Sequence, residues 1–331
     1  MTTTNPASWG VRGHERAIAF LKKSLERGML AHAYLFVGPQ GVGKLDLALG
    51  LAKAITCPSE AKPCLTCKSC TRIKMGTHTD VRVVTRTGAS VGIEQVRIIQ
   101  QNASLKPFEG FARVFIIDGA EAMTRDAANA LLKLLEEPPP YVYLLLLTSD
   151  ETAVPETVLS RCQRVTLLPF SQDEVVASLE EQGLAADQAR DIARLTRGRI
   201  TLAEEMARSP EALAERRERI RDLMGMTKLT KTERLKEAER MAAGFSRNRD
   251  GLFNDLALLT EGWRDLLLQQ AGLGNLALDP QLLPEKAPYP VEEIAGTLER
   301  LELSVQALRA NVNARLVLEA LLLAMPDQPV G

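Results

Sequence analysis

The fold of the first half of the chain depends on one stretch, Gly38-Pro39-Gln40-Gly41-Val42-Gly43-Lys44-Leu45. An apolar run at 33–37 precedes this stretch, and a helix-like run at 45–55 follows it. The order strand, glycine-rich loop, helix is the context of a P-loop, because backbone N–H groups and a helix N-terminus can then face a phosphate. An incidental glycine-rich turn is the alternative. The predicted nucleotide-binding residues are Gly38, Gly41, Gly43 and Lys44.

Leu45 departs from the P-loop pattern. The residue after the lysine is normally Ser or Thr, because its hydroxyl binds Mg²⁺. Leucine has no oxygen to offer a metal ion. The sequence therefore predicts a phosphate-binding fold that lacks one metal ligand.

A second apolar strand, Arg113–Asp118, ends in a carboxylate. This is the Walker B pattern, in which a buried strand delivers an acid to the Mg²⁺ beside the P-loop. A simple strand-ending acid is the alternative for Asp118. Hydrolysing ATPases of this kind usually carry Glu at the next position to orient the attacking water, whereas this chain has Gly119.

Four cysteines follow the P-loop helix with the spacing C-x6-C-x2-C-x2-C. Two overlapping C-x2-C steps and a fourth nearby cysteine can place four thiolates around Zn²⁺, and four thiolates leave no open position for catalysis. We therefore expect a structural zinc module, with free thiols in a loop as the alternative. The predicted ligands are Cys57, Cys64, Cys67 and Cys70. His78 and Asp80, just beyond, are read as a turn that leads into a strand at 81–84.

Composition bounds the function. The chain has 331 residues and a formal net charge of −1, so bulk charge does not favour nucleic-acid binding. Its N-terminus shows no signal-peptide pattern, and no apolar run reaches membrane-spanning length. We expect a cytoplasmic protein with no membrane contact.

The elements along the chain fall into an α/β part and a helical part. Helices are expected over 11–30 and from Thr124, as the cap, to Glu137, and a fully apolar and therefore central parallel strand over 141–148. Ser171 and Glu174 form a capping-box pattern that opens three short helices. Further helices are expected over 210–224, 231–246, 250–271, 293–310 and 312–325.

The motifs occur together and in a recognisable order. After the P-loop and the cysteines come Ile116-Ile117-Asp118, then a run at 129–139 that reads Asn-Ala-Leu-Leu-Lys-Leu-Leu-Glu-Glu-Pro-Pro, then Ser160-Arg161-Cys162. This combination resembles the clamp-loader branch of the AAA+ proteins, most of all its delta-prime family, with the tau/gamma ATPases next. The resemblance implies an α/β AAA+ domain with a parallel sheet over 1–169, the zinc module at 57–70, a three-helix lid over 170–209 and an all-α collar domain over 210–331.

The resemblance also implies a role. It places the chain in the DNA polymerase III clamp loader, with tau/gamma and delta subunits as partners, and with the sliding clamp and primed DNA reached through the complex. Arg161 matches the arginine finger of the family, which stabilises charge on the nucleotide of a neighbouring subunit. A surface ion pair is the alternative for Arg161.

Three departures from the family pattern point the same way. Leu45 removes a metal ligand, and Gly119 removes the carboxylate that orients water. Thr201 stands where hydrolysing members carry a lid arginine, although Arg199 is close enough to compensate. We therefore expect a subunit that does not hydrolyse ATP itself. Its own site is left with two outcomes, weak binding of ATP or ADP or no binding.

Two rival functions remain. One is an active AAA+ ATPase of the tau/gamma type, which Leu45 and Gly119 disfavour. The other is a zinc-dependent DNA-binding module, which the neutral net charge disfavours. Arg97 is the candidate DNA contact, since family members present a helix there to the central chamber, and a solvated helix residue is its alternative.

Overall fold

The computed structural model describes residues 9–88, 90–245, 247–285 and 287–327. Contacts divide the chain into two compact units, one of residues 1–175 with 197–203 and the other of residues 176–196 with 204–331. The division falls inside the segment expected to form a lid. The division into three domains therefore stays a prediction.

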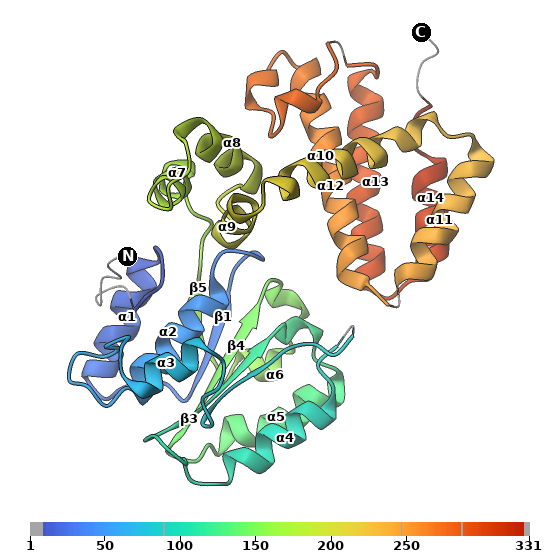
Figure 1. The fold of residues 1–331 in the computed structure, drawn as a ribbon. Coiled ribbons are helices and arrows are strands. Elements are labelled where there is room, and N and C mark those ends of the chain that lie inside the picture. The colour runs from blue at the N-terminus through green and yellow to red at the C-terminus, as the bar shows by residue number, and fades with distance from the viewer. Residues whose placement is uncertain (1–8, 89, 246, 286, 328–331) are drawn as a thin grey trace. The chain divides into compact units, whose positions relative to one another are not determined.

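The first unit contains a five-stranded parallel sheet in the order β2-β3-β4-β1-β5, which confirms the predicted fold class (Figure 1). The fully apolar β4 lies between β3 and β1, as expected for a strand that is covered on both faces. The register aligns Leu35 with Leu146 and Ile117 with Leu146 across these strands. The strands are β1 (Ala33–Val37), β2 (Val81–Val84), β3 (Arg113–Asp118), β4 (Val142–Thr148) and β5 (Gln163–Thr166).

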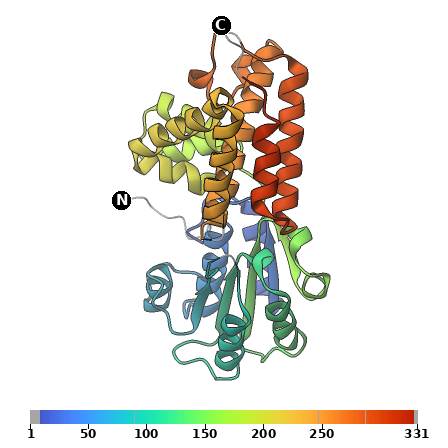
Figure 2. The ribbon, with the colours of Figure 1, turned by 90° about the vertical axis from the view of Figure 1, so that its right-hand side faces the viewer.

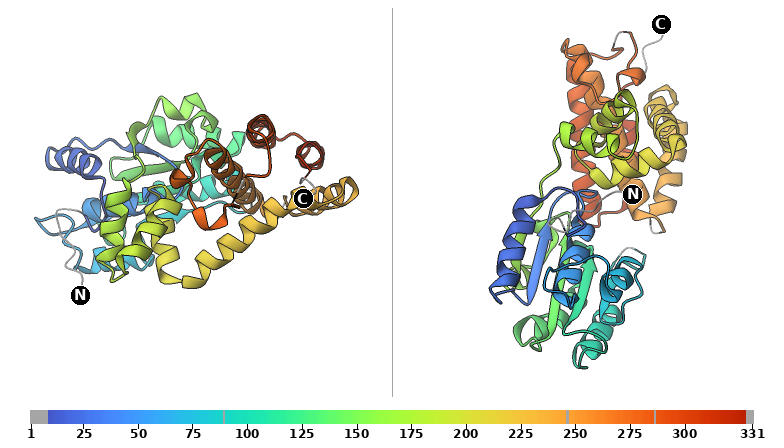
Figure 3. Two further views of the ribbon diagram at one scale, coloured as in Figure 1. Left: turned by 90° about the horizontal axis from the view of Figure 1, so that it is seen from above. Right: turned by 60° about the vertical axis from the view of Figure 1, so that its left-hand side comes forward.

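Helices cover both faces of the sheet (Figures 1 and 3). One core is formed with α1 (Glu15–Glu26) and α2 (Lys44–Thr56), and the other with α4 (Ile93–Ala103) and α5 (Arg125–Glu136). The predicted cap of α5 is present, since Thr124 Oγ1 accepts the N–H of Ala127 at 3.1 Å. Short elements complete the unit, namely α3 (Lys68–Lys74), α6 (Glu156–Leu159), η2 (Ala120–Ala122) and η3 (Glu151–Ala153).

Three short helices follow β5, as the sequence predicts. The backbone N–H of Ser171 donates to the Glu174 carboxylate at 2.7 Å, and the Glu174 N–H donates to Ser171 Oγ at 3.2 Å. This reciprocal pair is the expected capping box, which satisfies N–H groups that the first helical turn leaves open. The helices are α7 (Gln172–Glu180), α8 (Ala186–Thr196) and α9 (Ile200–Arg208).

The rest of the second unit is helical around a core that includes Trp263, and α12, α13 and α14 run side by side in it (Figure 2). Leu301 and Leu308 are buried in this core, whereas Val312 and Leu316 are exposed. The elements are α10 (Pro210–Met224), α11 (Lys231–Phe245), α12 (Arg249–Gln270), α13 (Val291–Arg309), α14 (Ala314–Leu323), η4 (Gly225–Lys228), η5 (Gly274–Leu276) and η6 (Pro280–Leu282).

Arg234 is a fully buried charge in α11, with 0% of its surface exposed. Its guanidinium donates to the carbonyls of Leu322 at 3.3 Å and Met325 at 2.6 Å, at the end of α14. It also donates to the Thr227 carbonyl at 2.9 Å and pairs with Asp327 at 2.7 Å. A buried guanidinium needs its donors satisfied, so these contacts tie α14 to α11.

Within the described residues, none of the helices has both the length and the apolar character needed to cross a lipid bilayer.

Candidate functional site

The glycine-rich loop predicted to bind phosphate joins β1 to α2, which is the expected order of strand, loop and helix. Gly41 and Gly43 have positive φ values of 82° and 91°, which glycine adopts without strain. Lys44 begins α2 and is only 9% exposed. Its Nζ donates to the carbonyls of Gly38 at 2.6 Å and Pro39 at 2.8 Å. The lysine that would reach a phosphate is therefore already bonded to its own loop.

Lys44 and Asp118 lie close enough for their charges to act on one another, and a shared nucleotide site stays a prediction. Burial lowers the pKa of Lys44, and the charges of Glu121 and Asp118 oppose that change. Burial also raises the pKa of Asp118, and Lys44 opposes it. Each group therefore stabilises the charged form of the other, as a lysine and a strand-ending acid do when they face the same ligand.

Leu45 packs away from this loop, whereas residues at the start of α9 contact it. The Leu45 side chain packs against the hydrophobic core on the α1 and α2 side of the sheet, so no polar group of this residue faces the loop. The backbone N–H of Thr201, at the start of α9, donates to the Gly41 carbonyl at 3.0 Å. Arg199 also approaches, and its Cβ lies 3.3 Å from the position that a side chain on Gly41 would take.

Gly119 sits in a backbone conformation that suits glycine, with φ at 90°. A Cβ at this position would lie 2.7 Å from Arg86 Nε, so a glutamate here would be strained and would require the Arg86 side chain to shift. The next acid along the chain is Glu121, three residues past Asp118. Its Oε1 accepts a hydrogen bond from Ser149 Oγ at 2.9 Å and lies 3.8 Å from Arg86.

The four predicted cysteine ligands converge at the end of α2. Their sulfur atoms all lie within 4.8 Å of one another, and Cys57 Sγ is 3.6 Å from Cys64 Sγ and 3.9 Å from Cys67 Sγ. Tetrahedral zinc with Zn–S bonds of about 2.3 Å places sulfurs about 3.8 Å apart, so these residues fit zinc. Hydrogen bonds, with the Thr66 N–H foremost, lower the pKa of Cys64 to about 6, which favours a thiolate. Burial raises the pKa of Cys70.

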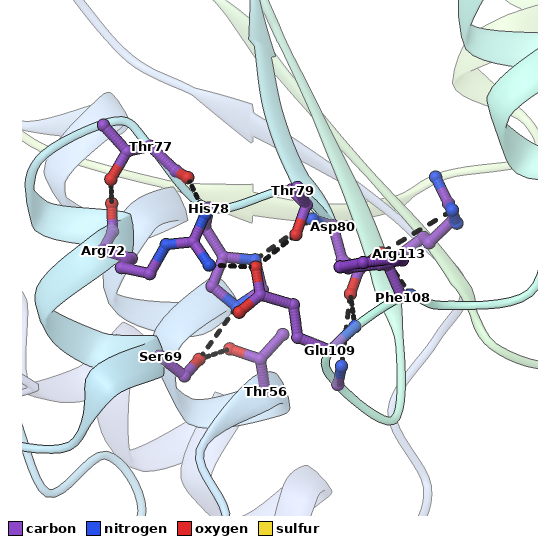
Figure 4. A network of polar contacts seen from close by, with 11 residues as sticks. Thr56, Ser69, Arg72, Thr77, His78, Thr79, Asp80, Phe108, Glu109 and Arg113 are labelled. Atoms are coloured by element: carbon purple, nitrogen blue, oxygen red, sulfur yellow. Dashed lines mark hydrogen bonds and ion pairs between the residues drawn. The ribbon is translucent and has the colours of Figure 1, made fainter.

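Asp80 lies in a turn, as expected, but it is also the centre of a buried polar network (Figure 4). Its carboxylate accepts the backbone N–H groups of Phe108 and Glu109, both at 2.8 Å, and of Gly110 at 3.2 Å. Arg113 lies 3.7 Å away. Asp80 thus fixes the loop that leads into β3, a role that its place before β2 did not reveal.

His78 connects this network to the cysteine module (Figure 4). Its Nδ1 accepts the backbone N–H of Asp80 at 3.1 Å, so the proton resides on Nε2, which lies 3.1 Å from Ser69 Oγ. Ser69 in turn contacts Thr56 Oγ1 at 2.9 Å. Burial lowers the pKa of His78, which keeps the ring neutral. Ser69 precedes Cys70 and Thr56 precedes Cys57, so the network supports two predicted metal ligands.

Arg161 follows α6 on the surface of the first unit. Its side chain is 36% exposed, and its Nη2 pairs with Glu136 of α5 at 2.6 Å. Its Nη1 donates to the Thr157 carbonyl at 2.9 Å. The surface ion pair considered for this residue is present, and it leaves the guanidinium accessible. Glu136 stood within the sequence motif at 129–139 but was not assigned a role from the sequence.

Arg97 lies on α4, as predicted, with its side chain 56% exposed and paired with Glu94 at 2.6 Å. A contact between Arg97 and DNA stays a prediction.

The sequence matches a known family. A family model described as DNA polymerase III, delta subunit, covers residues 13–171. DNA polymerase III subunit delta′ of Bacillus subtilis is 30% identical over 317 residues, which cover 94% of this chain and 96% of that protein. The chain belongs to the delta-prime family of DNA polymerase III subunits.

Other relatives agree with this assignment. The tau subunit of Escherichia coli DNA polymerase III is 30% identical over 83% of this chain, which spans 44% of that longer protein. Among solved structures, a gamma subunit-related protein of DNA polymerase III from Thermotoga maritima matches with a TM-score of 0.50, at 20% identity over 91% of this chain and 97% of that one. That similarity shows a shared fold. In this delta-prime family member, every predicted site residue falls inside the segment 13–171.

Proposed function

We propose that this chain is a subunit of the DNA polymerase III clamp loader that does not hydrolyse nucleotide and instead donates Arg161 to a neighbouring ATPase subunit. The observation that carries the first half is Leu45, whose side chain packs into the core at the position of a metal-binding hydroxyl. Without that hydroxyl, a Mg²⁺ ion beside the β- and γ-phosphates would have one protein ligand fewer.

The rest of the site supports the same conclusion. Lys44 is bonded to two carbonyls of its own loop, and a glutamate in place of Gly119 would be strained, because φ there is 90°. Phosphoryl transfer depends on positioning and charge stabilisation, so the loss of a metal ligand and of a water-orienting acid acts on the main contributions to rate. The glycines and Lys44 leave weak binding of ATP or ADP as a separate outcome.

Arg161 supports the second half. A guanidinium supplied by another subunit stabilises the charge that develops on a transferred phosphoryl group. Arg161 is accessible, and the backbone before it is fixed by the fully buried Val158. Its partners are then tau/gamma-type ATPase subunits, a delta subunit, and, through the complex, the sliding clamp and primed DNA in the cytoplasm.

Zinc has a structural part in this proposal. Cys57, Cys64, Cys67 and Cys70 would hold it, and four thiolate ligands leave no position open for water. Zinc would then stiffen the segment between α2 and α3, and the His78 network would support it from outside.

The test is the ATPase rate of the reconstituted clamp loader with sliding clamp and primed DNA present. Arg161→Ala is expected to slow hydrolysis at the site it serves by about 10³-fold or more, since fingers contribute 10³–10⁵ in rate. Lys44→Ala is expected to change turnover less than twofold, because its own site is silent.

Arg164→Ala is the matched control, since Arg164 is an exposed arginine three residues on and is paired with Glu151 of its own chain. It is expected to leave turnover unchanged. Metal-dependent hydrolysis by the isolated chain that Lys44→Ala abolishes would overturn the proposal and identify an active AAA+ ATPase instead.

A further inference from the structure

Glu136 holds the guanidinium of Arg161 on its own chain. It is the last residue of α5, and its Oε1 accepts from Arg161 Nη2 at 2.6 Å. Both side chains are partly in water, at 50% and 36% exposure. Exposed ion pairs of this kind are weak, so this contact can be broken without disturbing the fold.

The other contacts of Arg161 also come from its own chain. Nη1 donates to the Thr157 carbonyl at 2.9 Å and lies 3.3 Å from Ser160 Oγ. The backbone N–H of Arg161 donates to the Val158 carbonyl at 3.1 Å, and Val158 is fully buried. The backbone is therefore anchored, and only the side chain has to move to reach another molecule.

A phosphate and Glu136 compete for the same guanidinium. A nucleotide phosphate offers several anionic oxygens, and it repels a carboxylate that stays beside the same donor. The end of α5 adds a partial negative charge near Glu136, which further favours the arginine and disfavours an approaching anion. A guanidinium that turns to a phosphate must leave Glu136 behind.

We propose that Glu136 is a positioning residue that stores Arg161 on its own chain until the phosphate of a neighbouring subunit displaces it. This inference rests on the proposed function, because it assumes that Arg161 acts on another subunit. When Arg161 binds a phosphate of the neighbouring subunit, it gives up its ion pair with Glu136. The free energy of that ion pair is therefore subtracted from the binding of the nucleotide that Arg161 contacts.

The experiment uses Glu136→Gln in the complete clamp loader, with clamp and primed DNA, and measures ATP turnover against ATP concentration. Glutamine keeps the shape but removes the charge. The expected result is a two- to fivefold lower KM for ATP, the range of an exposed ion pair, with kcat changed less than twofold.

Glu137→Gln is the matched control, since it removes the same charge one residue later and Glu137 has no ion pair among the described residues. It is expected to leave KM unchanged. In an Arg161→Ala background, where turnover at the site is too slow to follow, the Kd for ATP measured by equilibrium binding is expected to be unchanged by Glu136→Gln, because the group that Glu136 holds is gone.

The outcomes separate the two proposals. If Arg161→Ala leaves turnover unchanged, the proposed function fails. If Arg161→Ala abolishes turnover at its site while Glu136→Gln leaves KM unchanged or raises it, only the storage role of Glu136 is overturned. A fall in KM with Glu136→Gln that Glu137→Gln reproduces also overturns it, because the effect would then be one of net charge.

Discussion

The two ends of α2 carry the two candidate binding sites of the first unit, and their side chains are arranged differently. At the N-terminal end, Lys44 donates to carbonyls of its own loop, and the neighbouring Leu45 packs into the core. At the C-terminal end, Cys57 leads into four sulfurs that lie within 4.8 Å of one another. The same buried helix positions both sets of groups. One end has turned its ligand-binding groups inward, whereas the other has kept its groups directed at a common centre.

The largest effect is expected from removing a cysteine ligand at the C-terminal end of α2. Cys67→Ser removes one sulfur of the four but leaves an oxygen that accepts the Cys70 N–H, so the N-cap of α3 is kept and the change acts on the metal site. Because the affinity of a structural zinc site depends on all four ligands, zinc affinity should fall by several orders of magnitude. Metal content after dialysis against a chelator measures this effect. Cys162→Ser, outside the cluster, should retain one zinc per chain. Full zinc retention by Cys67→Ser would show that the cluster does not bind metal as described.

A smaller effect is expected from substitutions at the N-terminal end of α2, where Leu45 lies. Leu45→Thr restores the hydroxyl, but Lys44 and Gly119 are unchanged, so the isolated chain should still show no metal-dependent ATP hydrolysis. Removing apolar contacts of a half-buried leucine should lower the unfolding free energy by about 1–2 kcal/mol, measured in urea. Adding Gly119→Glu should cost about 1–3 kcal/mol more, because φ at that position is 90°. Turnover restored by Leu45→Thr alone would mean that one residue silences the site.

The smallest effect concerns the charge that faces Lys44. Burial raises the pKa of Asp118, so at neutral pH its ionised form is less stable in the folded than in the unfolded chain. Asp118→Asn should therefore raise the unfolding free energy at pH 7 by about 0.5 kcal/mol. The gain should shrink as pH falls through the folded pKa and disappear below the unfolded value of about 3.9, where the wild-type carboxyl is protonated in both states. A loss of stability at pH 7 would show that Lys44 outweighs burial.

Local pattern was enough to predict the sheet, the caps and the cysteine cluster. The apolar run at β4 and the spacing of the four cysteines are properties of adjacent residues. Thr124 and Ser171 cap helices through contacts only three residues away. Such features follow from the chain itself, because the geometry of a turn or a strand fixes which neighbours meet.

Contacts between residues that lie far apart in the chain could not be predicted from the sequence. Asp80 meets the backbone at 108–110, nearly thirty residues on, and its place in a turn gave no sign of that burial. Glu136 reaches Arg161 only because α5 and the segment after α6 pack together. The bonds from Lys44 to Gly38 and Pro39 were hidden for another reason. A P-loop lysine has the same sequence pattern whether it faces a ligand or its own loop.

The buried Arg234 has a practical consequence for how the chain can be shortened. Its donors are satisfied by carbonyls up to Pro326 and by the Asp327 carboxylate. Deleting residues from 325 onward would strand part of a cation inside the helical core, a loss of about 3–5 kcal/mol. A protease that trims the chain to the end of α14 would thus destabilise the second unit. Carboxypeptidase digestion should therefore stop at the partners of Arg234, and an affinity tag should be attached after Asp327.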